Sequence, residues 1–218
     1  MTRESISNDV RRKAVWGGGV AGRATGVAAA LTLTILSSAC GDLTRQGTAS
    51  SYLIVTSLQA ASGAEPSKLG STLNSDVITV VDGVSTIFND LGQVTLRLAM
   101  KDAGATSPSE PTANNFITIN RYHVRFIRAD GRNVEGVDVP YSFDGAFTGT
   151  VTDSELTAGF ELVRHIAKTE APLAALARNV TIISTIAEIT FYGRDQTGRE
   201  VSVNGQMLVS FGNFGDPG

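Results

Sequence analysis

The sequence holds a single cysteine, Cys40, among 218 residues, and only two histidines, His123 and His165. One cysteine excludes a disulfide bond within the chain, and zinc sites usually need three or four histidine, cysteine or acidic ligands. His123 alternates with arginines in a pattern typical of the solvated face of a strand, and His165 also stands next to an arginine. We therefore expect both histidines to be surface residues, and we expect neither a metal nor a cofactor.

Long apolar runs are also missing. The uncharged stretch of residues 24–39 would span only about 24 Å as a helix, whereas the apolar core of a bilayer is roughly 30 Å thick. Arg11, Arg12 and Lys13 precede this stretch, and small residues end it. That order is typical of an export signal that is removed, not of a permanent membrane helix. The arginine pair also suggests twin-arginine export, but Lys13 and Ala14 stand where that signal has apolar residues.

The end of the export signal reads Leu-Ser-Ser-Ala-Cys-Gly over residues 36–41 and resembles the lipobox of bacterial lipoproteins, with Ser37 where the family usually has an aliphatic residue. The resemblance implies a diacylglycerol on Cys40, cleavage just before it and acylation of the new amino terminus. Such chains would hold the protein firmly on a membrane. Gly41 stands where an aspartate implies inner-membrane retention, so the resemblance favours the outer membrane or cell surface. An ordinary signal peptide that contains a cysteine is the alternative.

The chain is thus predicted to consist of a signal peptide (1–39), a lipid-anchored tether (40–50), one folded domain (51–212) and a flexible tail (213–218). The net charge of the whole chain is -3, and the leader is basic, so the exported part is more acidic still. An acidic domain argues against nucleic acid as a partner and against a polybasic membrane patch. Residues 102–115 are polar and could separate two domains, but we favour a loop within one domain, because three strands alone make a small, open sheet.

Alternation of apolar and polar residues with a period of two predicts strands along most of the domain. The segments concerned are 51–59, 93–101, 116–129, 141–151, 183–191 and 201–211. Within 116–129 the alternation changes parity, which predicts a β-bulge near Asn120 and Arg121. Gly205 lies in the middle of a predicted strand and indicates a bulge or the close approach of another segment.

Several shorter segments carry weaker signals. Residues 76–81 form an apolar, β-branched run that predicts a strand buried on both faces. The Asp-Gly pairs at 82–83 and 130–131 predict turns. We interpret residues 160–168 as a strand, with a helix as the alternative, and we expect a short helix over 171–178.

Seven to nine strands with turns between them favour an all-β fold, an antiparallel β-sandwich with one short helix. The pattern resembles the immunoglobulin or fibronectin type III architecture of bacterial surface and envelope proteins. The paired cysteines and the core tryptophan of antibody domains are absent, because Trp16, the only tryptophan, lies in the leader. A jelly roll is the alternative fold.

Residues that carry reactive chemistry are few. No nucleophile elbow, phosphate-binding loop or zinc-protease motif occurs, and Ser154 is interpreted as a turn residue because no base stands near it in the sequence. Oxygen-bearing side chains that could bind calcium form one cluster: Asp130, Asn133, Glu135 and Asp138. Arg121 and Arg125 share one face of a predicted strand and either bind an anionic partner or keep that face solvated.

These observations predict a non-enzymatic, lipid-anchored envelope protein that presents loops or a strand edge to a partner. The partner would be an envelope protein or a glycan, and the membrane would be contacted through the lipid on Cys40. The alternatives are a structural subunit of an envelope assembly and a hydrolase that gathers a histidine and acidic residues in a pocket.

Overall fold

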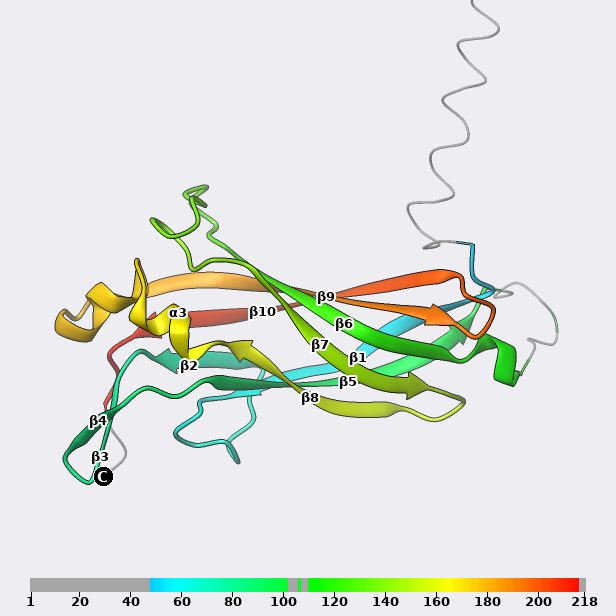
Figure 1. The fold of residues 1–218 in the computed structure, drawn as a ribbon, viewed down its shortest axis with the longest axis horizontal. Coiled ribbons are helices and arrows are strands. Elements are labelled where there is room, and N and C mark those ends of the chain that lie inside the picture. Colours follow the sequence, from blue (N-terminus) through cyan, green and yellow to red (C-terminus); the bar gives the residue numbers. More distant parts are fainter. Residues whose placement is uncertain (1–47, 102–105, 107–109, 216–218) are drawn as a thin grey trace, which may run out of the picture. The chain divides into compact units, whose positions relative to one another are not determined.

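The computed structural model describes residues 48–101, 106 and 110–215. These residues form two facing β-sheets and a small separate hairpin, with short helical segments between some strands (Figure 1). One sheet has the strand order β1–β5–β8, the other has the order β2–β10–β9–β6–β7, and β3 pairs with β4 alone. The all-β sandwich expected from the sequence is confirmed.

The strands and helices occupy most of the described chain. The strands are β1 (Ser51–Ala61), β2 (Thr72–Asp76), β3 (Thr79–Val81), β4 (Val84–Thr86), β5 (Asp90–Met100), β6 (Ile117–Ile127), β7 (Phe143–Val151), β8 (Leu156–Val163), β9 (Ile183–Asp195) and β10 (Glu200–Gly212). The helical segments are the 3-10 helix η1 (Ala113–Asn115), the α-helix α3 (His165–Thr169) and the 3-10 helix η2 (Leu173–Arg178).

The order of the strands is that of an immunoglobulin-like sandwich. In immunoglobulin letters the three-stranded sheet is A–B–E, and the five-stranded sheet runs G–F–C–C′ from β10 to β7, with β2 added at the edge. β2 lies parallel to β10, whereas the other strand pairs of the described residues are antiparallel. β5 precedes residues 102–115 and β8 follows them, yet the two strands pair. This stretch therefore joins strands of one sandwich.

Aromatic side chains fill the space between the two sheets. Phe191 on β9 is fully buried, and its ring centroid lies 5.3 Å from that of Phe160 on β8 and 5.5 Å from that of Phe147 on β7. Tyr122 on β6 lies 5.3 Å from Phe160, and its hydroxyl oxygen accepts a hydrogen bond from the Glu161 N–H at 3.2 Å. Edge-to-face aromatic pairs add to the free energy of burial, so this cluster holds the edge strands β7 and β8 to the centre of the sandwich.

Two local predictions about the strands are confirmed. The pairing of β6 with both of its neighbours shifts between Ile119 and Arg121, and the bulge leaves both Asn120 and Arg121 exposed. At Gly205 an added Cβ atom would lie 3.0 Å from Leu58 Cδ2 on β1 of the other sheet. This is the close approach that a mid-strand glycine indicates, and the register of β10 continues through it without a shift.

The prediction of one buried strand over residues 76–81 is wrong. β2 ends at Asp76, and β3 begins at Thr79. Val80 and Val81 are 37% and 41% exposed. The reason is topological: β3 pairs only with β4, so its valines have no opposing sheet to cover them.

The predictions for residues 160–168 and 171–178 are correct only in part. The strand β8 ends at Val163, and the chain then turns into α3. Asp90 stands opposite Val163, and the turn into α3 keeps Lys168 beside this buried carboxylate, whereas a continuing strand would carry Lys168 past it. The second helix is shorter than expected and is the 3-10 segment η2.

Candidate functional site

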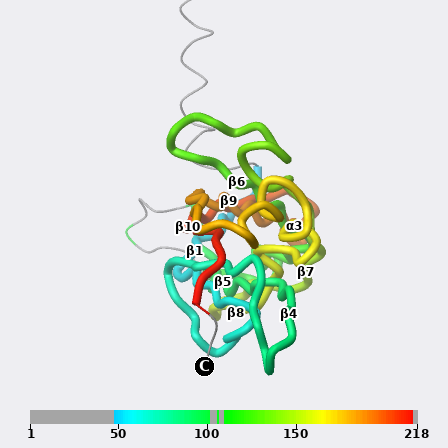
Figure 2. Tube along the Cα trace, turned by 90° about the vertical axis from the view of Figure 1, so that its left-hand side faces the viewer, coloured from blue at the N-terminus to red at the C-terminus, as the bar shows by residue number. Residues whose placement is uncertain are grey.

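The connections between strands gather at two ends of the sandwich. β1 begins at the end that also holds the β7–β8 turn (152–155) and the β9–β10 turn (196–199), which we call the proximal end (Figure 1). The distal end holds the β3–β4 hairpin, the β6–β7 connection (128–142) and the β8–β9 connection (164–182). Figure 2 looks onto the distal end and shows these three connections standing around the ends of the strands.

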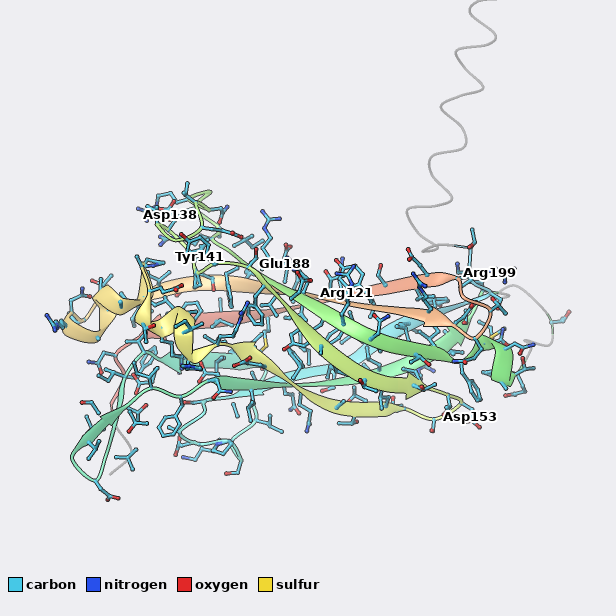
Figure 3. The ribbon with its side chains drawn as sticks, in the orientation of Figure 1. Arg121, Asp138, Tyr141, Asp153, Glu188 and Arg199 are labelled. Carbon is cyan, nitrogen blue, oxygen red and sulfur yellow. The ribbon has the colours of Figure 1, made fainter. Side chains whose placement is uncertain are left out.

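The two ends differ in polarity. The proximal turns carry polar side chains, including Asp153 and Arg199, which are labelled in Figure 3. Large exposed hydrophobic side chains of the described residues all lie in distal connections or in the distal half of a strand: Leu69, Val80, Val81, Val84, Leu91, Val134, Val137, Tyr141, Ile166, Val180, Ile182 and Leu208. Single exposed apolar residues are normal on a protein surface, but their confinement to one end is typical of an interaction surface.

The β3–β4 hairpin contributes three valines to the distal end. Asp82 and Gly83 at its tip have φ angles of 50° and 75°, as a type I′ turn requires, so the turn predicted from this Asp-Gly pair is confirmed. Val81 pairs with Val84 across the turn, and Val84 is 64% exposed. The hairpin therefore holds apolar side chains in water on a short, hydrogen-bonded support.

A buried ion pair fixes α3 to the sandwich. Lys168 Nζ lies 2.9 Å from Asp90 Oδ2 and 3.0 Å from Asp90 Oδ1, and the two side chains are 1% and 0% exposed. The Ser75 hydroxyl and the Gly63 N–H also donate hydrogen bonds to this carboxylate, at 2.6 and 3.0 Å. Burial raises the pKa of Asp90 above its usual value, although the Lys168 ammonium and these hydrogen bonds oppose the rise.

A half-open cavity of about 330 Å³ lies beside α3. Its lining residues come from the end of the β6–β7 connection, the start of β7 and the segment after β8: Tyr141, Phe143, Arg164, Ile166, Ala167 and Glu170. The Arg164 guanidinium carbon lies 4.0 Å from the centroid of the Phe143 ring, a cation–π arrangement. Tyr141 and Ile166 are 55% and 47% exposed, so the cavity combines apolar walls with a cation. We call it the Arg164 pocket.

The four side chains proposed for calcium all lie in the β6–β7 connection, where each serves the loop itself. Asp130 pairs with the arginines at 128 and 132, and the hydrogen bond from Arg128 holds the pKa of Asp130 below its usual value. Asn133 and Asp138 accept backbone N–H groups of the loop at 2.6 and 3.1 Å, and Glu135 accepts the Ser142 N–H at 3.3 Å. Among the described residues, no three His, Cys, Asp or Glu side chains are grouped as a metal site would need.

Arg121 and Arg125 lie on the outer face of the five-stranded sheet, as expected from their spacing (Figure 3 labels Arg121). Arg121 Nη1 lies 3.3 Å from Asp144 Oδ1, and its guanidinium carbon lies 3.9 Å from the Tyr192 ring centroid. Arg125 stands opposite Glu188 in the pairing of β6 with β9. Acidic side chains therefore accompany both arginines, which makes this face less suited to an anionic partner than the sequence suggests.

A shallow cavity of about 440 Å³ adjoins Arg121 at the β-bulge, lined by β6, β9 and β10. Its second arginine, Arg194, forms an ion pair with Glu200 at 2.9 Å. Gly193 between the strands has no room for a side chain, because an added Cβ would lie 2.5 Å from the Thr118 carbonyl oxygen. The cavity is thus a polar surface whose charges are largely matched.

Neither histidine joins a reactive group. His123 Nδ1 lies 3.3 Å from Asp144 Oδ1 on the sheet face, and His165 is exposed on α3. Ser154 bonds to the Thr152 hydroxyl at 3.0 Å within the β7–β8 turn. Ser154 lies in a proximal turn, His165 on α3 in a distal connection and His123 in the middle of β6, so the structure does not bring them together as a hydrolase site would require.

Cys40 lies outside the described residues, so its lipidation stays a prediction. None of the helices in the described ranges is both long enough and apolar enough to form a membrane span. The chain matches no known protein family, no curated protein and no solved structure. The difference in polarity between the two ends is the feature of this chain that points most clearly to a function.

The residues of the Arg164 pocket and of the buried ion pair were not singled out as site residues by the sequence. Two sequence features could have indicated them: Arg164 interrupts the alternation of 160–168, and Lys168 follows Arg164 by one helical turn. Their partners Asp90 and Phe143 are distant in sequence. The pairing of β5 with β8 brings Asp90 near Lys168, whereas Phe143 lies on β7 of the other sheet, where its ring contacts Arg164.

Proposed function

We propose that the protein is a non-enzymatic, lipid-anchored envelope module that binds a partner protein through its distal end. The single observation that carries this proposal is the confinement of exposed large apolar side chains to that end. Apolar surface kept in water is costly to a soluble domain unless a partner covers it.

The point at which the described chain enters the sandwich is consistent with an anchor at the end opposite the distal loops. The described chain enters β1 at the proximal end, so a tether that starts at Cys40 would attach there. β1 has eleven residues, which at about 3.3 Å per residue places the distal end about 35 Å farther from the tether. A module built in this way holds its polar end toward the anchor and its apolar loops toward a partner.

The anchor and the docking end are tested separately. For the anchor, Cys40→Ser should abolish labelling by a radioactive fatty acid and release the protein from the membrane fraction. Unchanged labelling would remove the lipoprotein part of the proposal and leave the docking part standing.

For the docking end, a photo-reactive amino acid is placed in cells at the distal positions Val84, Val134 and Val180, and at the proximal positions Ser154 and Thr197. We expect adducts of one common mass from the distal positions and none from the proximal ones. Equal capture at both ends, or capture only at the proximal end, contradicts the proposal. A common adduct of twice the chain's own mass would favour instead a structural subunit that assembles with copies of itself.

A further inference from the structure

Arg164 stacks on an aromatic ring and is not paired with an acidic side chain of the described residues. Among the described residues no ion pair involves Arg164, and its guanidinium stacks on Phe143 instead. By contrast, Arg128 and Arg132 in the neighbouring connection both pair with Asp130. A guanidinium that stacks by its face leaves its N–H groups free at the edge, where they match both oxygens of a carboxylate.

The segment that carries Arg164 and the ring beneath the guanidinium are held by the core. Val163, directly before Arg164, is fully buried, and Phe143 below the guanidinium is 7% exposed. Four residues after Arg164, Lys168 is tied to Asp90 by the buried ion pair. Both ends of the segment that carries Arg164 are thus held by the core, and a pocket with fixed walls loses little entropy on binding.

The other lining groups define the rest of the ligand. Tyr141 and Ile166 present exposed apolar surface next to the cation, and the volume of about 330 Å³ suits a small group and not a whole domain. Glu170 also lines the pocket, and its charge opposes a ligand of high negative charge. One carboxylate on an apolar body satisfies the cation and covers the walls.

We propose that the Arg164 pocket binds a single carboxylate group carried on an apolar or aromatic body. The carboxylate would accept hydrogen bonds from Arg164, and the body would lie against Tyr141 and Ile166. Two sources offer this chemistry: the carboxyl-terminal end of a polypeptide with an apolar last residue, and a free organic acid. The first source rests on the proposed docking function of the distal end, whereas the second does not.

The test uses ligand-observed ¹⁹F NMR with the full chain in detergent micelles, with micelles alone as the blank. The probe is 4-(trifluoromethyl)phenylacetate, and its primary amide is the matched neutral compound. We expect the carboxylate to bind and the amide to bind at least about tenfold more weakly, as the loss of one charge-assisted interaction implies. Equal binding of the two compounds, or no binding of either, overturns the proposal.

Two substitutions with opposite expected signs locate the site. Arg164→Gln should weaken binding of the carboxylate by about tenfold or more, and Glu170→Gln should strengthen it by a few fold because a repulsive charge is removed. Arg125→Gln on the sheet face is the control and should change nothing. An unchanged affinity in both Arg164→Gln and Glu170→Gln overturns the assignment. If Arg164→Gln fails to fold by circular dichroism, the sign of the Glu170→Gln effect decides alone.

A competition experiment separates the two sources. Acetyl-Ala-Ala-Phe with a free carboxyl end, and the same peptide with an amidated end, are added to the bound probe. Displacement by the free-carboxyl peptide alone supports recognition of a chain end. Binding of the probe without displacement by either peptide supports a free organic acid, and this result leaves the pocket assigned even if the photo-crosslinking at the distal end fails.

Discussion

Replacing Lys168 with methionine tests whether the buried ion pair holds the distal helix in place. Methionine fills a similar volume with apolar atoms, so the substitution removes the charge while leaving no large cavity. It leaves Asp90 buried with the Ser75 hydroxyl and the Gly63 N–H as its remaining hydrogen-bond donors. The loss of stability comes from the buried carboxylate that is left without a cation, and not from the lost contact itself.

The magnitude follows from this uncompensated charge. Breaking a buried pair by removing one partner costs roughly 3–5 kcal/mol of unfolding free energy. For a domain of this size each kcal/mol lowers the melting temperature by about 2–4 °C, so we expect a decrease of about 6–20 °C. Removing both charges, as in Asp90→Asn combined with Lys168→Met, should recover at least about half of the lost free energy, because no unpaired ion is left.

The destabilisation caused by Lys168→Met should also depend on pH. Lys168 is the largest influence that lowers the pKa of Asp90, and burial already raises that pKa above 3.8, so removing Lys168 raises it further. A carboxyl group with a raised pKa in the folded state stabilises the fold at low pH, and this contribution is lost as the pH rises through the folded pKa. The single variant should therefore fall farther below the wild type at about pH 8 than at about pH 5.

Thermal and urea unfolding of the full chain, followed by far-UV circular dichroism, measure these quantities. Tryptophan fluorescence is unsuitable because Trp16 lies outside the described sandwich. A cost of Lys168→Met below about 1 kcal/mol, with no difference between the two pH values, would refute the argument. So would a double variant that is less stable than Lys168→Met alone.

Other predictions address the sheets. Gly193→Ala places a Cβ 2.5 Å from the Thr118 carbonyl oxygen, whereas the nearest atom to a Cβ at Gly159 is 3.8 Å away; urea unfolding should show a loss of about 1–3 kcal/mol for Gly193→Ala and no comparable loss for Gly159→Ala. Asp195→Ala removes the acceptor of the Thr197 and Arg199 N–H groups and should cost about 1–3 kcal/mol at neutral pH. Burial raises the pKa of Asp195, but hydrogen bonds from Thr197 and Arg199 outweigh it and hold the pKa below 3.8. The stabilisation by this carboxylate is therefore present above pH 3.8 and should be lost as the pH falls through its lowered pKa. An equal cost of Asp195→Ala at neutral pH and at a pH below that pKa would contradict the assignment.

Much of the sandwich follows from alternation alone. In β9 and β10 most apolar residues share one parity, and the structure buries that set, including Ile189 and Phe191. The parity change within β6 locates the bulge because two outward residues in a row are possible only where an extra residue is inserted. These features are local, so one strand's own residues suffice to predict them.

The distal end was less accessible to prediction, because its structure depends on contacts that are distant in sequence. Val80 and Val81 carry the signature of a buried strand and become exposed because their hairpin joins neither sheet. A lysine is typical of the protein surface, but Lys168 is buried because its ammonium group pairs with the buried carboxylate of Asp90. In both cases the residue type predicts the burial that is usual for it, and the fold places the side chain in an environment with the opposite burial.

The direction of each strand decides at which end of the sandwich a connection lies, and this is why the sequence could not place the pocket relative to the start of β1. Consecutive strands of the sandwich mostly alternate in direction, so each connection is assigned to an end by the number of strands before it. One misplaced strand moves every later loop to the opposite end. The parallel strand β2 and the outlying β3–β4 hairpin make that count ambiguous in the first third of the domain. The β6–β7 and β8–β9 connections share one end in any case, because two strands separate them, and there Tyr141 and Arg164 line one pocket. Whether this end lies opposite the start of β1 is known only when β2 and the β3–β4 hairpin are placed.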